Sequence, residues 1–267
     1  MNISNTGNSL PRWRFPRKRS QFSLLLLALL LVSPIPCAAQ SKKDLSSYYN
    51  LFDSIIGIEN LEIHYGEVYV EKHRTKSKKT KFFPSPNFML GSVVFNGLPY
   101  YSVNLKYNVY EDELLMKIAN RLGGEILQVY KDKVNSFAMG NHSFVKIEPR
   151  KTSNKTIESG FYEILLELTV SDLYKKHRKR LTDTLGENLI FYEFEDLSPE
   201  FVVYSRSDYH KVQRIMDLKG IFPEYTEQLG NFVKTLPPDS SFEDHLKTTL
   251  IFINTLIAPE KDNPIME

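Results

Sequence analysis

Residues 101–109 of the chain read Tyr-Ser-Val-Asn-Leu-Lys-Tyr-Asn-Val, an unbroken alternation of apolar and polar side chains. Because successive side chains of a β-strand point to opposite faces of its sheet, this period of two predicts a strand with one buried face. Just upstream, Asn96-Gly97 follows the stretch Ser92–Phe95 and tolerates the positive φ of a tight hairpin turn. The stretch therefore predicts an antiparallel β-hairpin.

Segments of the same kind recur along the chain and are joined by short connections such as Gly123-Gly124 and Gly140-Asn141. Connections of hairpin length imply antiparallel neighbours. The other segments with this pattern are Leu61–His73, Glu113–Ile118, Glu125–Tyr130, Val134–Met139, His142–Ile147, Phe161–Val170, Leu173–Leu181, Leu189–Glu195 and Phe201–Ser205. We therefore expect an antiparallel β meander of about ten strands, forming a curved sheet or an incomplete barrel after a short polar lead at Ser41–Tyr49.

The spacing changes to that of helices near the C-terminus. Ser207 can cap a helix that runs to about Leu218, and Pro223 fits the first turn of a second helix. Ser241 with Asp244 resembles the capping box of a third. Strands followed by helices predict the α+β class. The expected organisation is a β-rich domain at residues 40–206, a C-terminal segment of about three helices packed on the sheet at 207–258, and a tail at 259–267.

Residues 1–39 have the features of a secretory signal peptide. Five basic residues precede the apolar run Leu24–Val32, and Cys37-Ala38-Ala39 supplies the small residues of a cleavage site before Gln40. The run is about nine residues long, whereas a helix needs roughly 20 to span a bilayer. We expect a cleaved, exported chain without a transmembrane span in its mature part, located in the periplasm, at the outer membrane or outside the cell.

Two alternatives stay open for this segment. An uncleaved N-terminal anchor would leave the rest of the interpretation unchanged. A lipid could instead be attached to Cys37, although Pro34-Ile35-Pro36 lacks the pattern that usually precedes a lipidated cysteine. Because Cys37 and Trp13 are the only cysteine and tryptophan, a chain cleaved before Gln40 contains neither residue and has no disulfides.

Cleavage would also change the charge. Residues 1–39 contain five basic residues and no acidic ones, so their removal turns the formal net charge of +2 into about −3. A mildly acidic domain is a poor candidate for nucleic-acid binding, which needs a basic face to neutralise phosphates. We therefore expect no nucleic-acid partner.

The strongest candidate for ligand binding is a basic stretch at residues 72–81 without an acidic residue. It could meet anionic lipid or a polyanionic glycan through Lys72, Arg74, Lys76, Lys78, Lys79 and Lys81. The alternative is a solvated connection between strands. A second basic run, Lys175–Arg180, fits an exposed strand edge whose charges resist edge-to-edge pairing.

The sequence has no motif that identifies a reaction. None of the six histidines has a second histidine or a carboxylate at the spacing of metal ligands on one helical face, and H-E-x-x-H is absent. The chain also lacks a G-x-S-x-G nucleophile elbow and a G-x-G-x-x-G phosphate loop. We therefore expect no catalytic residues, no metal site and no cofactor, and whether the protein is an enzyme stays open, with a non-catalytic role favoured.

Three segments resemble landmarks of a group of exported, uncharacterised proteins of Bacteroidetes-type bacteria. They are Val93–Asn108 followed by Glu111–Leu115, then Gly160–Leu165, and then Phe201–Ser205 before the helical tail. The resemblance implies a location in a Gram-negative cell envelope and no established activity or site residues. In its arrangement of strands and helices, the expected fold also resembles the incomplete barrels of periplasmic lipoprotein carriers, which hold acyl chains between sheet and helices.

These observations lead to three functional hypotheses. The first is a non-catalytic envelope protein that binds an apolar or envelope ligand, or a partner protein, in the cavity between sheet and helical tail or at residues 72–81. The second is a hydrolase built on two carboxylates without a sequence signature, roughly 5 to 9.5 Å apart. The third is a structural subunit of an envelope assembly that is recruited through an exposed sheet edge.

Overall fold

The computed structural model describes residues 42–57, 60–75, 78–118, 124–148, 150–151, 156–185 and 190–257. Contacts within the chain divide it into two units, Met1–Lys42 and Lys43–Glu267. The expected signal peptide at residues 1–39 and the tail at 259–267 lie outside the described residues.

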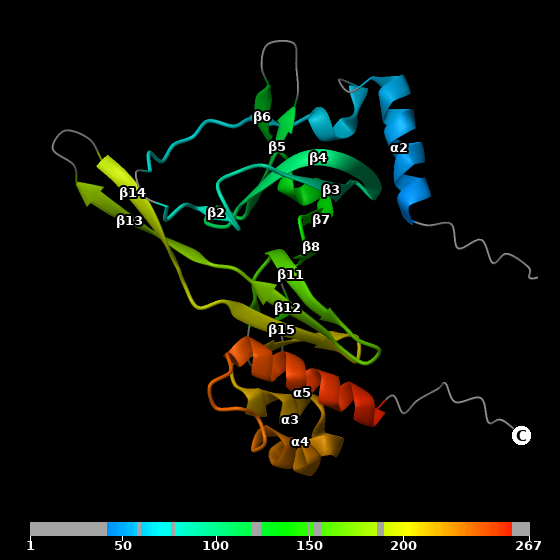
Figure 1. Cartoon of the computed structure of the whole chain (residues 1–267), viewed down its shortest axis with the longest axis vertical. Coiled ribbons are helices and arrows are strands. Elements are labelled where there is room, and N and C mark those ends of the chain that lie inside the picture. Colours follow the sequence, from blue (N-terminus) through cyan, green and yellow to red (C-terminus); the bar gives the residue numbers. More distant parts are fainter. Residues whose placement is uncertain are drawn as a thin grey trace, which may run out of the picture. The chain divides into compact units, whose positions relative to one another are not determined.

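The second unit is built on a large, open, antiparallel sheet (Figure 1). Its strands hydrogen-bond in the order β1-β6-β5-β4-β3-β7-β8-β11-β12-β15-β16, and β2 also pairs with β4. The strands are β1 Glu67–Val68, β2 Phe82–Phe83, β3 Met89–Phe95, β4 Leu98–Asn108, β5 Glu113–Ile118, β6 Glu125–Gln128, β7 Val134–Met139, β8 His142–Ile147, β11 Gly160–Glu167, β12 Asp172–Lys176, β15 Glu200–Ser205 and β16 Asp208–Val212. The predicted α+β class is confirmed, with more strands than the expected ten.

Two short hairpins lie outside this sheet. β9 (Arg150–Lys151) pairs with β10 (Thr156–Ile157), between β8 and β11 along the chain. β13 (Lys179–Leu185) pairs with β14 (Ile190–Asp196). The predicted strand Leu173–Leu181 is therefore right only up to Lys176, because the chain leaves the main sheet after β12 and enters this separate hairpin at Lys179.

The alternating stretch at residues 101–109 lies mostly in β4, but a bulge changes which of its side chains are buried. Its register with β3 shifts between Gly91 and Ser92, and Ser102 has a φ of 58°. Beyond the bulge Leu105 and Tyr107 are buried as the alternation predicts, whereas before it Tyr100 is buried in place of Tyr101. A bulge inserts one residue and so reverses the side-chain alternation on either side.

Two sequence-based assignments before β3 are wrong. The polar lead expected at Ser41–Tyr49 lies mostly within α2, a helix over Lys42–Ile56. The predicted strand Leu61–His73 contains only the 3-10 turn η2 (Glu62–His64) and the two-residue β1. Polar residues at the start of α2 conceal its helical spacing of apolar side chains.

The helix predicted from Ser207 to Leu218 is also wrong over its first half. Arg206 and Ser207 have φ values of 53° and 64°, and they form the two-residue turn that joins β15 to β16. Such turns usually contain Asn-Gly. Because this one has no glycine, the sequence did not indicate a hairpin.

The remaining C-terminal segment is helical as predicted. It contains η4 (Ile215–Asp217), α3 (Leu218–Ile221), η5 (Pro223–Tyr225), α4 (Thr226–Val233) and α5 (Phe242–Ile257). The Ser241 hydroxyl accepts a hydrogen bond from the Asp244 N–H at 3.1 Å and donates one to the Asp244 carboxylate at 2.6 Å. This contact confirms that Ser241 caps α5.

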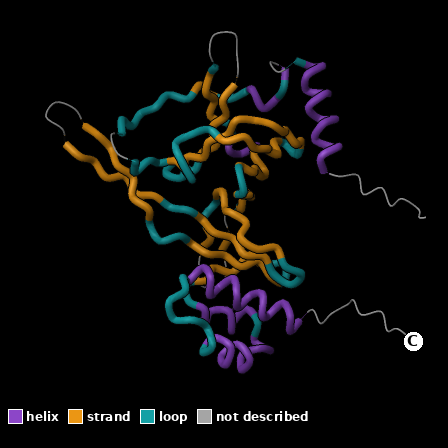
Figure 2. Tube along the Cα trace, in the orientation of Figure 1, coloured by secondary structure: helices purple, strands orange, loops and turns teal. Residues whose placement is uncertain are grey.

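The helices cover one end of the sheet, where β15 and β12 lie beside α5 (Figure 2). A cluster of buried side chains joins the two layers: Leu173, Phe201 and Val203 from the strands, and Leu229, Leu246, Leu250 and Ile253 from the helices. A second cluster, which includes Val93, Tyr107, Phe137 and Phe144, lies on the part of the sheet from β3 to β8. The first cluster holds α5 against the sheet and so positions a cavity at the start of α5.

Candidate functional site

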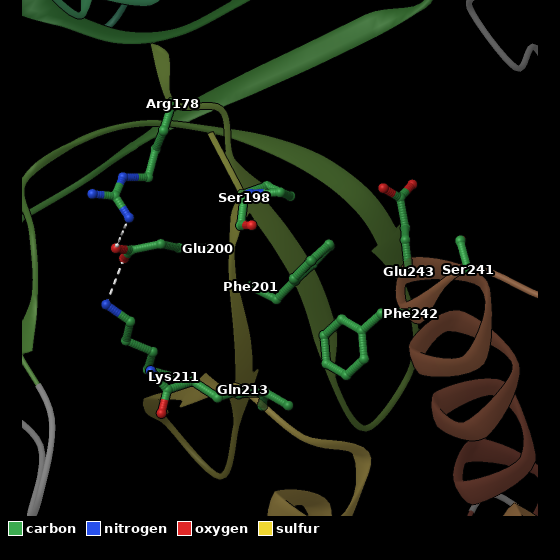
Figure 3. A pocket seen from close by; sticks show the side chains of 11 residues that line it. Arg178, Ser198, Glu200, Phe201, Lys211, Gln213, Ser241, Phe242 and Glu243 are labelled. Atoms are coloured by element: carbon green, nitrogen blue, oxygen red, sulfur yellow. Dashed lines mark ion pairs between the residues drawn. The ribbon is translucent and has the colours of Figure 1, made fainter. Parts of the chain in front are cut away.

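A cavity of about 600 Å³ lies between the sheet and the start of α5 (Figure 3). Its wall combines side chains from β15, β16, the segment before β13 and the N-terminal turn of α5. They are Arg178, Ser198, Pro199, Glu200, Phe201, Lys211, Val212, Gln213, Ser241, Phe242 and Glu243. A cavity between sheet and helical tail was predicted from the sequence, and this one lies there. We call it the α5 cavity.

Glu200 is the central charged group of the α5 cavity, and its side chain is only 10% exposed. Arg178 and Lys211 approach its carboxylate from different elements, as Figure 3 shows, with N–O distances of 3.1 and 2.7 Å. The Lys211 ammonium lies next to the buried Oε2 and forms an ion pair with it. Because a carboxylate oxygen has two lone pairs, Glu200 Oε2 can accept a further hydrogen bond beside this ion pair.

The second carboxylate of the wall, Glu243 in the first turn of α5, has two ammonium partners. Lys175 on β12 and Lys247 on α5 each donate a hydrogen bond to it at 2.6 Å. Burial alone would raise the pKa of Glu243, but the hydrogen bonds from both lysines outweigh burial and hold the pKa below its ordinary value. Glu243 is therefore ionised at neutral pH.

Two aromatic rings form the apolar part of the wall. Phe201 on β15 and Phe242 on α5 lie with their ring centroids 5.4 Å apart, at an interplanar angle of 68°. Phe201 belongs to the buried cluster under the helices, and Phe242 packs against that cluster while half-buried. The cavity thus places an aromatic surface next to the charged group around Glu200.

The charged groups of the α5 cavity are better suited to binding an anion than to catalysing a proton transfer. Arg178 and Lys211 of the wall contact Glu200, and Lys175 and Lys247, which lie behind the wall, neutralise Glu243. Both carboxylates are ion-paired, and the lowered pKa of Glu243 removes it as a general acid near neutral pH. The arrangement can bind a molecule that has an anionic group and an apolar part.

The predicted basic stretch at residues 72–81 is divided by the fold. Lys72, Arg74 and Lys78 are exposed, and Lys76 lies outside the described residues. Backbone hydrogen bonds from Tyr192 N to Arg74 O and from Phe194 N to Lys79 O, at 2.9 and 3.0 Å, hold the stretch along β14. Anion binding by its exposed members stays a prediction.

Two members of that stretch have carboxylate partners. The Lys79 ammonium lies 3.2 Å from the Glu193 carboxylate. Lys81 is 2% exposed, and its ammonium lies 3.0 Å from Glu71 and 3.2 Å from Glu111. Because a buried charge must be paired, Lys81 holds the loop to the turn after β4 and is not presented to an external anion.

A histidine pair that the sequence did not indicate flanks the buried Glu163 of β11. His142 Nδ1 and His177 Nε2 lie 2.5 and 2.6 Å from the two carboxylate oxygens of Glu163, and both rings contact Phe83. Burial raises the pKa of Glu163, but the two histidine hydrogen bonds outweigh it and lower the pKa. Among the described residues, no group of three metal-ligating side chains has the arrangement of a metal site.

The charged residues of the α5 cavity did have a partial sequence signal. The basic run Lys175–Arg180 contains Lys175 and Arg178, but its prediction as an exposed strand edge is wrong, because β12 lies between β11 and β15. Lys176 in this run is buried and donates to the Ser159 carbonyl at 2.8 Å. Glu200, Lys211 and Glu243 had no sequence signal of their own.

In the described part of the chain, no helix is long and apolar enough to cross a membrane. Comparisons of the sequence with protein-family models and with curated proteins, and of the fold with solved structures, gave no match.

Proposed function

We propose that this chain is an exported, non-catalytic protein of the cell envelope that binds an amphipathic anion in the α5 cavity. The ligand class is a carboxylate or phosphate head group with an apolar chain. The observation that carries the proposal is the juxtaposition of Phe201 and Phe242 with Arg178 and Lys211 in one cavity.

The size and lining of the cavity support a small ligand. Sites for small molecules typically have volumes of 300 to 1,000 Å³ and combine aromatic side chains with a few polar groups, and the α5 cavity of about 600 Å³ fits both features. The guanidinium of Arg178 has five N–H donors in a planar fork, which suits a carboxylate or phosphate. The head group would lie at Arg178 and Lys211, with the chain along Phe201 and Phe242.

The paired carboxylates argue against the hydrolase hypothesis for this cavity. A glycosidase-type mechanism needs one carboxyl group that stays protonated near neutral pH. Glu200 contacts two cations, and Glu243 has a lowered pKa. Export is supported by the basic and apolar segments of residues 1–39 and by the resemblance to exported proteins of Bacteroidetes-type bacteria.

Isothermal titration of the purified protein with dodecyl phosphate tests the ligand class. The wild type should bind one molecule per chain, and Arg178→Ala should weaken binding by about tenfold or more, because it removes charge-assisted hydrogen bonds to the head group. Decanol, which has the chain without the charge, should bind more weakly than dodecyl phosphate.

Arg180→Ala is the matched control. Arg180 lies two residues further along, is 64% exposed and pairs with Glu195 on β14, away from the cavity wall. It should leave the affinity unchanged. Equal affinities in the wild type and both variants, or no binding to the wild type, would contradict the proposed site.

A further inference from the structure

α2 presents an apolar face to solvent. Leu45, Tyr48, Leu51, Phe52 and Ile55 are 53, 69, 59, 58 and 74% exposed. At 3.6 residues per turn these five positions lie within one arc of the helix, which is the pattern of an amphipathic helix. A helix of this kind normally turns its apolar face to the protein core, so the orientation of α2 is inverted.

The orientation of α2 is set by contacts of its other face with the sheet. Asn50 donates a hydrogen bond to the Ser102 hydroxyl at 3.4 Å, and the rings of Tyr49 and Tyr101 lie 6.0 Å apart. Asn50, Asp53 and Ser54 also line a cavity of about 280 Å³ against β4 and β5. Because the polar face contacts the sheet, the apolar face must point away from it.

We propose that the outward face of α2 lies in the surface layer of a lipid bilayer. This inference is independent of ligand binding in the α5 cavity. Interfacial helices bury such a face about 5 to 10 Å into the boundary between head groups and acyl chains, where tyrosine is favoured. Tyr48 and Phe52 supply aromatic rings to that layer, and Leu45, Leu51 and Ile55 supply aliphatic side chains.

The chain outside the described residues favours a bilayer as the occupant. The apolar run Leu24–Val32 ends ten positions before α2 begins at Lys42. A connection of that length spans at most roughly 35 Å when fully extended. While the apolar run is still attached, during export or as the uncleaved anchor left open above, its insertion in a membrane holds α2 close to the same membrane surface, where even weak insertion of the apolar face is favoured.

A second copy of the chain is a poorer occupant. α2 has 15 residues and is therefore about 22 Å long, so one face of roughly 10 Å width offers a few hundred Å² to a partner. A stable protein interface buries at least about 1,200 Å² in total. Pairing of two α2 helices alone falls well short of that area, whereas insertion into a bilayer has no such minimum.

Site-specific tryptophan fluorescence tests this inference in the full chain. Trp13 is the only tryptophan, so Trp13→Phe gives a background without one. Phe52→Trp in that background, reconstituted with vesicles of phosphatidylcholine, should shift its emission to the blue, and brominated phosphatidylcholine should quench it at least twofold. Ile55→Trp, on the same face, should behave in the same way.

Ile190→Trp on β14 is the matched control, since Ile190 is also a large exposed apolar residue, at 49%. Its emission should not change with brominated lipid. The inference is overturned if Phe52→Trp and Ile55→Trp are quenched no more than Ile190→Trp. It is equally overturned if their blue shift occurs without vesicles and grows with protein concentration, which would indicate a second copy as the occupant.

Discussion

α2 and α5 are similar in length, with 15 and 16 residues, and both are amphipathic, yet they contact the same sheet with opposite faces. α5 buries Leu246, Leu250 and Ile253 completely against the sheet and the other helices. α2 contacts the sheet through Asn50 and Tyr49 and leaves its apolar face in solvent.

The difference shows that an amphipathic pattern predicts a helix but does not predict which face of the helix packs against the protein. α5 contributes to the core and shapes a cavity with charged walls. α2 contributes few buried apolar atoms, and its exposed face is available to another apolar phase. The stability of the fold should therefore depend strongly on α5 and weakly on α2.

The largest difference is expected for truncation of one leucine in each helix. Leu250→Ala removes a completely buried side chain and should lower the free energy of unfolding by about 2 to 5 kcal/mol. Leu51→Ala removes a side chain that is 59% exposed and should change it by less than about 0.5 kcal/mol. Urea unfolding followed by circular dichroism measures both, and equal losses would invalidate the comparison.

The carboxylates at the two helix–sheet contacts should respond to pH with opposite signs. The lowered pKa of Glu243 means that its contribution to stability is present at neutral pH and is lost on acidification, as the pH falls from about 4.3 through the lowered pKa. Glu243→Gln should therefore destabilise the protein by about 1 to 2 kcal/mol at pH 7, with a loss that disappears in acid.

Asp53 on α2 should show the reverse. Burial raises its pKa, and the charge of His64 offsets this only in part. A raised carboxyl pKa stabilises the fold at low pH, and this contribution is lost as the pH rises through the raised value. Asp53→Asn should be neutral or stabilising at pH 7. Urea unfolding between pH 3 and 7 distinguishes the two signs, and a parallel response of both variants would count against these pKa assignments.

The smallest expected difference concerns single polar contacts of the two helices. Ser241→Ala removes the cap of α5 and should cost about 1 kcal/mol. Asn50→Ala removes a long, exposed hydrogen bond from α2 and should cost less than about 0.5 kcal/mol. Thermal unfolding measures both changes. A larger loss for Asn50→Ala would mean that α2 is held more firmly than its contacts indicate.

The parts of the fold that the sequence predicts are those with local signals. β5, β7 and β8 have the predicted bounds, because clear alternation is combined there with short connections. The cap of α5 was also predicted, because Ser241 and Asp244 lie three residues apart in the sequence.

The missed elements had misleading local signals. The Arg206-Ser207 turn has the positive φ values of a hairpin without glycine, and so resembled a helix cap. The bulge at Ser102 inverted part of the most regular alternation in the chain. The start of α2 contains more polar than apolar residues, and its apolar positions become regular only over several turns.

The residues of the candidate site could not be predicted from the sequence for a different reason. Arg178, Glu200, Lys211 and Glu243 come from four segments, and the long-range pairings of β12 with β15 and of α5 with the sheet bring them together. No periodicity in the sequence encodes these pairings. Only the expectation of a cavity between sheet and helices could be drawn from the order of the elements.

Native mass spectrometry of the protein recovered from its native host tests the central claim most directly. Gln213 is an exposed residue of the cavity wall, so Gln213→Trp should fill the α5 cavity without disturbing the core, whereas Gln228→Trp places the same ring on the exposed side of α4. The wild type and Gln228→Trp should retain one small ligand of the same mass, and Gln213→Trp should be recovered without it. Retention of that ligand by Gln213→Trp, or its absence from all three proteins, would contradict ligand binding in the α5 cavity.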